Sequence, residues 1–179
     1  MSVLSNVDIR ECLEFGSLRV YGLNKDTIRE NGLDLTISEI YARENPDYDN
    51  SYVDIHDQDP NRFRKETCNS GNIIIRPHEF VLFSTNEIIE IPSDIVGFCA
   101  IRSTIARSGL FAPSTIVDAG FCGALTIEVF NASNRNIILH PGDRFLHVIL
   151  SYTKTPCDAP YSGLYQNQKI ITLPKKSIL

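Results

Sequence analysis

The stretch "TIVDAGFCGALTIEVFN", residues 115–131, decides the fold class of this chain. Its second half alternates as a β-strand does, and one face of that strand would carry Leu125, Ile127 and Val129. The opposite face would carry Thr126, Glu128 and Phe130. Asp118 stands before Ala-Gly, which is typical of a turn. The stretch therefore predicts two short strands joined by a turn, with one acid at the turn and another inside the second strand.

Short runs of the same kind fill the chain on both sides of this stretch. They are "LRVYGL", "LDLTISEIY", "NIIIRP", "EFVLFS", "IIEIP", "IVGFCAI", "NIILHPGD", "RFLHVILSY" and "KIITLP". Many short strands at close spacing favour an antiparallel barrel or jelly roll over alternating β/α units. The predicted fold class is therefore mainly β, a distorted β-barrel or jelly roll. At 179 residues the chain is expected to form a single domain, 1–179.

Only two segments have a helical pattern. "SNVDIRECLEFG", residues 5–16, begins with the good helix caps Ser5 and Asn6 and ends at Gly16. It predicts a short N-terminal helix. Residues 103–108 predict a single helical turn after the strand that ends at Ile101.

Composition narrows the classes of partner. The net charge of −5 argues against a broad nucleic-acid-binding face, although a small basic pocket for a phosphorylated molecule is compatible with it. No apolar run approaches the ~18 residues of a membrane span, and the N-terminus lacks the apolar core of a signal peptide. A cytoplasmic protein with no membrane or nucleic-acid partner is expected.

The five cysteines give no sign of a metal site. The closest pair, Cys99 and Cys122, is 23 residues apart, and there is no C-x-x-C or H-x-E motif. The sequence therefore predicts reduced thiols and no zinc. The segment 44–61 carries six acidic residues and two prolines and predicts a solvated loop. A calcium site there is an alternative, but the aspartate spacing does not fit the twelve-residue calcium loop.

The stretch "RSTIARSGL", residues 102–110, is a candidate phosphate site. If a helical turn forms at 103–108, Ser103 and Arg107 lie on one face. Free N–H groups at a helix start, with a hydroxyl and guanidinium groups nearby, suit a polyphosphate. Two structural alternatives stay open: the arginines could pair with carboxylates across a subunit interface, and Glu128 could be an ordinary outward-facing glutamate.

Several strings together resemble a known family. "RSTIAR", "TIVDAGFCGALTIEVFN", "YSGLYQNQ" and "DTIRENGLDL" are similar to the dCTP deaminase branch of the dUTPase-like trimeric superfamily, in its archaeal form. The resemblance covers residues from about 5 to 174. It implies a dUTPase-like β-fold, a homotrimer with active sites at subunit interfaces, and a C-terminal tail, 161–179, that closes over the site.

The resemblance also implies roles for particular residues. Arg102, Ser103 and Arg107, within the run that includes Thr104, Ile105 and Ala106, would hold the triphosphate and flank the base. Asp118 would pack by the deoxyribose, and Thr126, Ile127 and Glu128 would bind the pyrimidine. Tyr161, Tyr165 and Gln168 belong to the closing tail. Mg²⁺ would enter with the triphosphate, and dTTP would act as an inhibitor.

The implied reaction is hydrolysis of dCTP to dUTP and ammonia without zinc. Glu128 would take a proton from the water that adds to cytosine C4, while Ser103 and Arg107 orient the water and stabilise developing charge. Three alternatives remain. A dUTP diphosphatase would use Asp118 to position a water for attack on the α-phosphate. A bifunctional enzyme would do both reactions, and a silent regulatory trimer would only bind nucleotide.

Four departures from the family pattern bear on these roles. The span from Arg107 to Asp118 is two residues shorter than in bacterial deaminases, and "APST" replaces "H-x-T-A". Leu164 stands where the tail normally has a lysine, a phosphate contact that Lys169 could supply. His147 replaces a glutamine, and a satisfied histidine on a core strand is the preferred interpretation.

Overall fold

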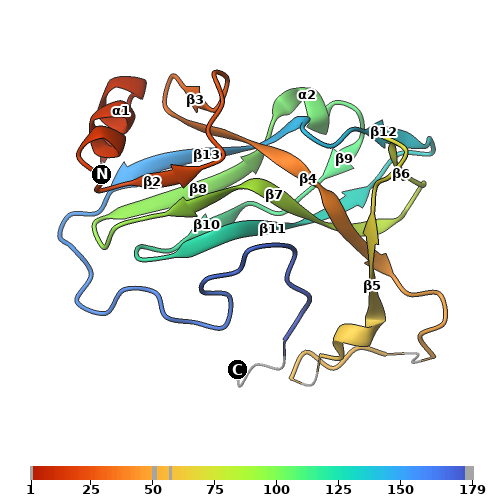
Figure 1. Cartoon of the computed structure of the whole chain (residues 1–179). Coiled ribbons are helices and arrows are strands. Elements are labelled where there is room, and N and C mark those ends of the chain that lie inside the picture. The colour runs from red at the N-terminus through yellow and green to blue at the C-terminus, as the bar shows by residue number, and fades with distance from the viewer. Residues whose placement is uncertain (1, 50–51, 57, 176–179) are drawn as a thin grey trace.

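One long strand, β4 (Gly32–Glu44), runs through both halves of a curled antiparallel sheet (Figure 1). Near its start β4 pairs with β13 (Arg144–Tyr152), where Asp34 faces His147. Further along it pairs with β7 (Phe80–Glu90), where Tyr41 faces Phe83. The two halves of the sheet therefore share a strand, and side chains from both halves meet between them. The computed structural model describes residues 2–49, 52–56 and 58–175.

The remaining elements extend this frame. The strand order of the main sheet is β10-β8-β13-β4-β7-β11-β9, with β1, β2, β3 and β5 pairing at its margins, and β6 pairs with β12 in a separate two-stranded sheet. Their bounds are β1 Ser2–Val3, α1 Asn6–Glu14, β2 Arg19–Tyr21, β3 Ile28–Arg29, η1 Pro60–Arg62, β5 Phe63–Thr67, β6 Ile73–Ile75, β8 Ile95–Ile101, α2 Ser103–Ala106, β9 Leu110–Phe111, β10 Thr115–Val117, β11 Cys122–Asn131 and β12 Ile137–Leu139. This arrangement confirms the prediction of a mainly β, curled-sheet fold.

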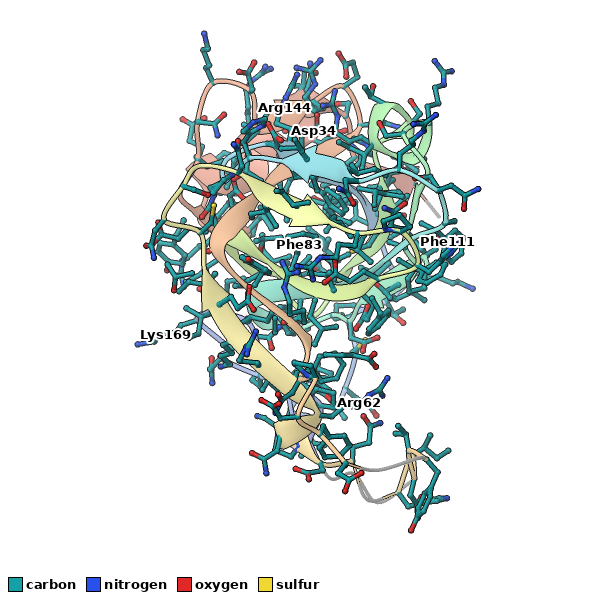
Figure 2. All side chains as sticks on the ribbon, turned by 90° about the vertical axis from the view of Figure 1, so that its right-hand side faces the viewer. Asp34, Arg62, Phe83, Phe111, Arg144 and Lys169 are labelled. Atoms are coloured by element: carbon teal, nitrogen blue, oxygen red, sulfur yellow. The ribbon has the colours of Figure 1, made fainter. Side chains whose placement is uncertain are left out.

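The core lies between the two halves of the sheet. Phe83 of β7 and Phe145 of β13 have 0% and 1% of their surfaces exposed, and their ring centroids are 5.8 Å apart. Tyr41 of β4 extends the contact, with its ring 6.1 Å from that of Phe83. Figure 2 shows Phe83 in the middle of the molecule, with Asp34 and Arg144 together at one end and Arg62 at the other. Burial of these rings is one of the apolar contacts that hold the two halves together.

The N-terminal helix forms where the sequence predicts it. Ser5 caps α1: its hydroxyl accepts a hydrogen bond from the N–H of Asp8, and the Asp8 carboxylate accepts one from the N–H of Ser5. Ile9 and Cys12 face the core. The chain leaves the helix through Gly16, which has a φ of +71°. No helix among the described residues is long and apolar enough to cross a membrane.

Two strand predictions need correction. The runs "EFVLFS" and "IIEIP" form one continuous strand, β7, rather than two. The polar residues between them stay in the strand because the buried Thr85 hydroxyl accepts a hydrogen bond from Leu125 N–H, at the point where the β11–β7 register shifts. "KIITLP", residues 169–174, is not a strand. The nearby β-bridge pairs Gln168 with Gly123, just before this segment, and Thr172 N–H bonds to the Thr126 hydroxyl instead of a backbone carbonyl.

The acidic segment 44–61 leaves the body of the protein beyond β4 and returns through η1 to β5 (Figures 1 and 2). Most of its described residues are exposed, as the sequence predicts for a loop. The turn of 3-10 helix at Pro60–Arg62 was not predicted; Asp59 caps it by accepting a hydrogen bond from Asn61 N–H. Among the described residues, no group of three or more His, Cys, Asp or Glu side chains could hold a metal ion.

A pair of substitutions tests the role of the ring contact. Phe83→Ala removes a fully buried ring and leaves a cavity, so we expect the free energy of unfolding to fall by about 3–5 kcal/mol. Phe15→Ala is the matched control, since Phe15 is 81% exposed and its loss should change stability little. Urea unfolding of both variants and the parent at one protein concentration measures the difference. Equal stability losses in the two variants would contradict this account of the core.

Candidate active site

A pocket of about 480 Å³ lies between β10, β11 and the C-terminal segment. It collects most of the site residues predicted from the sequence, namely Asp118, Thr126, Ile127, Glu128, Tyr161, Tyr165 and Gln168. Figure 1 shows the C-terminal segment running along β11 on the side away from β7 and β2. Strand, turn and tail therefore come together as one concave surface.

The alternation of β11 sets the direction of Glu128. Thr126, Glu128 and Phe130 are half-buried, whereas Ile127 and Val129 are buried in the main core. The predicted two-faced strand is thus confirmed, with Glu128 on the face that looks into the pocket. Burial raises the pKa of the Glu128 carboxyl, and a hydrogen bond to its own backbone partly opposes the rise. Glu128 is therefore suited to hold and release a proton nearer neutrality than an exposed glutamate.

The floor of the pocket holds a thiol that the sequence did not single out. Cys99 of β8 faces Thr115 of β10 in the strand pairing, and both line the pocket. Burial raises the pKa of the Cys99 thiol to about 11; the nearby Glu128 carboxylate adds to the rise, and a hydrogen bond with Thr115 opposes it. Cys99 consequently remains a neutral thiol at physiological pH. Its only sequence signal is its position three residues before Arg102.

The turn at Asp118 brings the tail against the strand. Asp118 follows β10 and is exposed, and its carbonyl accepts a hydrogen bond from Phe121 N–H across the turn. Gly120 has a φ of +90°, and a Cβ atom there would lie 2.5 Å from Pro160 Cβ. At Gly123 a Cβ atom would lie 2.9 Å from the Gln168 carbonyl oxygen. The two glycines are therefore what allow the tail to approach this closely.

The tail is held to its own chain by several hydrogen bonds. Asn167 N–H donates to Cys122 O at 2.7 Å, and Ala124 N–H donates to Gln168 O at 2.8 Å. Further along, Thr172 N–H donates to the Thr126 hydroxyl at 3.1 Å. Ile171, 1% exposed, packs beside Ala42, Phe63 and Leu82 in a small second core. Residues 176–179 of the predicted closing tail lie outside the described residues.

Gln168 has an unused hydrogen-bond acceptor. Its amide nitrogen donates to the Ala124 carbonyl, whereas its Oε1 atom is buried and accepts no hydrogen bond from the described residues. Gln168 lines the pocket, but this oxygen itself is buried, so it is an unsatisfied acceptor rather than an exposed contact for a ligand.

The arginine motif lies elsewhere. None of residues 102–107 lines the pocket. They follow β8, beyond Cys99, and form the predicted helical turn, α2, in which Arg107 N–H donates to Ser103 O at 2.9 Å. Ser103, Thr104, Ala106 and Arg107 are exposed, and no carboxylate of the described residues pairs with Arg107. A single chain therefore does not bring this motif and Glu128 into one pocket.

Arg102 instead joins a charged cluster around the buried carboxylate of Asp34. Arg102 Nε lies 3.1 Å from Asp34 Oδ2, and Arg144 Nη1 lies 3.5 Å from the same oxygen. His147 Nδ1 lies 2.8 Å from Asp34 Oδ1, so His147 is a satisfied histidine. Asp34 thereby fixes the start of the 102–107 motif to β4. The signal that could have identified Asp34 is an acid inside the apolar run "GLDLTI", which is costly to bury without a partner.

Sequence relatives show the family to which this chain belongs. A family model described as dCTP deaminase-like matches residues 3–152. The chain belongs to the dCTP deaminase-like family. Over 173 residues it is 44% identical to a dCTP deaminase of Pyrobaculum arsenaticum, covering 97% of this chain and 96% of the relative. It is 43% identical to a dCTP deaminase of Sulfurisphaera tokodaii, covering 97% of this chain and 92% of that protein.

Solved structures support the dCTP deaminase-like fold. The 2′-deoxycytidine 5′-triphosphate deaminase from Agrobacterium tumefaciens superimposes with a TM-score of 0.65 and 17% identity, covering 83% of this chain. The match spans 47% of the Agrobacterium chain, and at this identity it shows the fold alone. A dUTPase of Staphylococcus bacteriophage 80alpha gives a TM-score of 0.50 at 16% identity, covering 82% of this chain and 89% of the other.

The raised pKa of Glu128 predicts a pH-dependent effect on stability. Between about pH 4.3, the ordinary pKa of a glutamate, and the higher folded-state pKa, the folded protein binds more protons than the unfolded chain. Stability due to Glu128 therefore falls as the pH rises through this window. We expect Glu128→Gln to be more stable than the parent at pH 7, with the difference vanishing below about pH 4.

Urea unfolding across this pH range measures the effect. Glu39→Gln on the exposed face of β4 is the control and should show no such trend. A Glu128→Gln difference that does not change with pH would contradict the assignment of a buried, titrating carboxyl.

Proposed function

We propose that this protein is a dCTP deaminase that converts dCTP and water to dUTP and ammonia. The observation that carries the proposal is Glu128, a half-buried carboxylate that faces the pocket and whose pKa is raised by burial. Dedicated relatives 43–44% identical over almost the whole chain carry the name dCTP deaminase. They favour this function over a dUTP diphosphatase, and phosphate cleavage gives no reason for a proton-accepting group at Glu128.

The proposed step uses a carboxylate to activate water. Glu128 accepts a proton as the water oxygen bonds to cytosine C4, which becomes tetrahedral. Glu128 passes this proton to N3. The new hydroxyl on C4 then gives its proton, through Glu128, to the amino group; the C4–N bond breaks, the C4 carbonyl forms and ammonia leaves. Each proton removed from water is returned to the leaving group or the ring, so the reaction needs no oxidant or reductant.

Other pocket residues would bind the nucleotide around this step. Thr126 and Ile127 precede Glu128 on β11 and would contact the pyrimidine, and Gln168 would contact the ligand from the tail. Asp118 lines the pocket at the turn between β10 and β11, where it would accept a hydrogen bond from the sugar hydroxyl. Tyr161 and Tyr165 of the tail would cover the bound nucleotide.

Residues 102–107 would act on the pocket of a neighbouring copy in a homotrimer. Support comes from the exposure of Ser103, Thr104, Ala106 and Arg107, and from the absence of residues 102–107 from the pocket of their own chain. Exposed apolar side chains on edge strands, Phe111 on β9 and Ile116 on β10, fit a surface that another copy covers. In this assembly Arg102, Ser103 and Arg107 of one copy would hold the triphosphate above Glu128 of the next.

Magnesium would enter with the triphosphate, neutralise part of its charge and keep several waters of its own. No cluster of His, Cys, Asp or Glu among the described residues could hold a metal ion, so phosphate oxygens and waters would supply the ligands. Inhibition by dTTP and a cytoplasmic location stay predictions of the same proposal.

The decisive assay is incubation with dCTP and Mg²⁺, with nucleotides separated by chromatography. We expect dUTP to accumulate, and Glu128→Gln to lower kcat by about 10²–10⁴ because the proton acceptor is lost. Glu39→Gln is the control and should keep parental activity. Release of dUMP and pyrophosphate from dCTP would indicate a bifunctional enzyme. Intact dCTP with cleaved dUTP, unaffected by Glu128→Gln, would refute the deaminase.

Mixing two inactive variants tests the shared site. Arg107→Ala and Glu128→Gln subunits, co-expressed in equal amounts, should regain activity in up to about a quarter of the sites, since one site in four combines an intact Arg107 with an intact Glu128 from its neighbour. Each variant alone is the control. Absence of recovery in trimers shown to be mixed would place both residues in the site of a single chain.

A further inference from the structure

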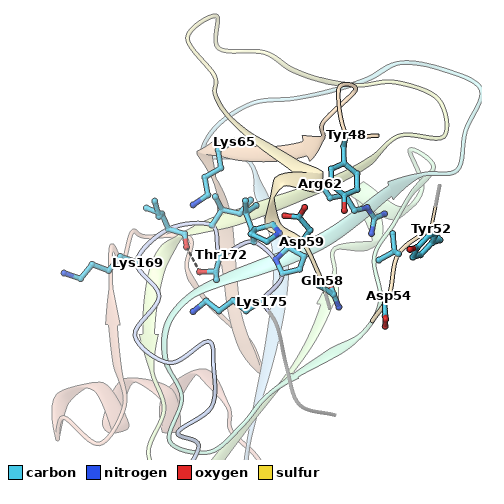
Figure 3. A pocket seen from close by; sticks show the side chains of 16 residues that line it. Tyr48, Tyr52, Asp54, Gln58, Asp59, Arg62, Lys65, Lys169, Thr172 and Lys175 are labelled. Atoms are coloured by element: carbon cyan, nitrogen blue, oxygen red, sulfur yellow. Dashed lines mark hydrogen bonds between the residues drawn. The ribbon is translucent and has the colours of Figure 1, made fainter. Parts of the chain in front are cut away.

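A second hollow, the lysine groove, adjoins the Glu128 pocket. It has a volume of about 960 Å³ and lies between the 44–61 loop, β5 and the tail (Figure 3). Its cationic lining residues are Arg62, Lys65, Lys169 and Lys175, and its acidic ones are Asp54 and Asp59. Among the described lining residues, cations therefore outnumber acids by two to one, on a protein whose net charge is −5. Such a local reversal of sign favours an anionic ligand.

The lysines are not used by internal ion pairs. No carboxylate of the described residues lies within salt-bridge distance of Lys65, Lys169 or Lys175. Lys175 Nζ donates to the Leu164 carbonyl at 2.7 Å and lies 5.7 Å from the centre of the Tyr165 ring. Arg62, in contrast, pairs with Glu44 and stacks on Phe63. The three ammonium groups retain most of their capacity to bind an anion.

The fold brings together the segments that carry these lysines. On β5, Phe63 is buried and Lys65 shares its face, whereas Arg64 and Glu66 point to the other face, where they pair with each other at 3.0 Å. Phe63 packs beside Ile171 of the tail, so Lys65 stands next to the segment that carries Lys169 and Lys175. In Figure 3 all three lysines lie on one side of the groove around Thr172, with Lys169 directed outward.

The lysine groove adjoins the Glu128 pocket, and the two share part of their lining. Gln58, Arg62, Thr172 and Pro174 line both hollows. Thr172 is fixed there by its hydrogen bond to Thr126 on β11. The two hollows are therefore neighbours, and we expect a ligand with its uncharged end in the Glu128 pocket to place its charged end near the lysines.

We infer that the lysine groove binds a polyphosphate chain. Several unpaired ammonium groups on adjacent segments suit a ligand with several negative groups in a row, and lysine binds phosphate as a point charge that needs no fixed geometry. The chain belongs either to the nucleotide in the Glu128 pocket or to a separate polyphosphate molecule. The first source rests on the proposed function; the second does not.

Binding of inorganic triphosphate, measured by calorimetry, tests the groove directly. The experiment uses the full-length protein in an Arg107→Ala background, which silences the proposed phosphate contact of the arginine motif. We expect Lys65→Gln/Lys169→Gln to bind triphosphate at least about tenfold more weakly than the background protein. Lys25→Gln/Lys154→Gln, two exposed lysines outside both hollows, is the charge-matched control and should bind normally. No binding, or equal binding by all three proteins, overturns the inference.

Steady-state kinetics with dCTP, in the chain with Arg107 intact, identifies the source of the phosphates. If they belong to the bound nucleotide, Lys65→Gln/Lys169→Gln raises KM for dCTP about tenfold and leaves kcat close to the parental value. If they belong to a separate molecule, KM is unchanged while triphosphate binding is lost. A protein that binds triphosphate through these lysines but forms no dUTP rejects the deaminase and keeps the groove. A protein that forms dUTP but binds triphosphate independently of these lysines keeps the deaminase and rejects the groove.

Discussion

The pairing of β4 with both halves of the sheet is the constraint on which the other features depend. Because one strand contributes to both halves, the Asp34 cluster at its start and β5 at its end are held at a fixed separation. The Phe83–Phe145 contact then closes the halves onto each other. The Glu128 pocket forms on the outer side of this closed frame, where β11 continues the sheet beyond β7. A rigid support of this kind suits the proposed site, in which the Glu128 carboxylate must be held at a fixed position relative to a nucleobase.

The burial of charge has opposite consequences at the two ends of the molecule. Asp34 is 3% exposed and faces two arginines and a histidine, so its charge is compensated where it is buried. Glu128 has no cationic partner among the described residues, and its carboxyl is disfavoured as an anion. The first arrangement stabilises the position of a loop, whereas the second makes the ionised form of Glu128 unfavourable, as expected of the proposed proton acceptor. The presence or absence of cationic partners therefore distinguishes Asp34, a structural carboxylate, from Glu128, the proposed proton acceptor, more clearly than sequence context does.

Local patterns in the sequence were enough to predict most of the long strands, the helix α1 and the face of β11 that carries Glu128, but not β1, β3, β5 or β9. These features depend on periodicity and capping, which act over a few residues. The same patterns split β7 in two, because the buried hydroxyl of Thr85 satisfies backbone groups of a distant strand. The place of the arginine motif was also beyond local patterns: spacing in the chain does not reveal whether Arg107 and Glu128 meet within one copy. The lysine groove combines β5, a loop and the tail, so only tertiary structure could bring its cations together.

The two glycines beneath the tail limit how this protein can change. At Gly120 any other residue would strain the backbone and push against Pro160, and at Gly123 it would collide with the Gln168 carbonyl. A mutation at either position would therefore have to be accompanied by a new path for residues 160–168. Segments that are separate in the sequence thus have to change together, and a designer who alters the path of the C-terminal segment must redraw the turn at the same time.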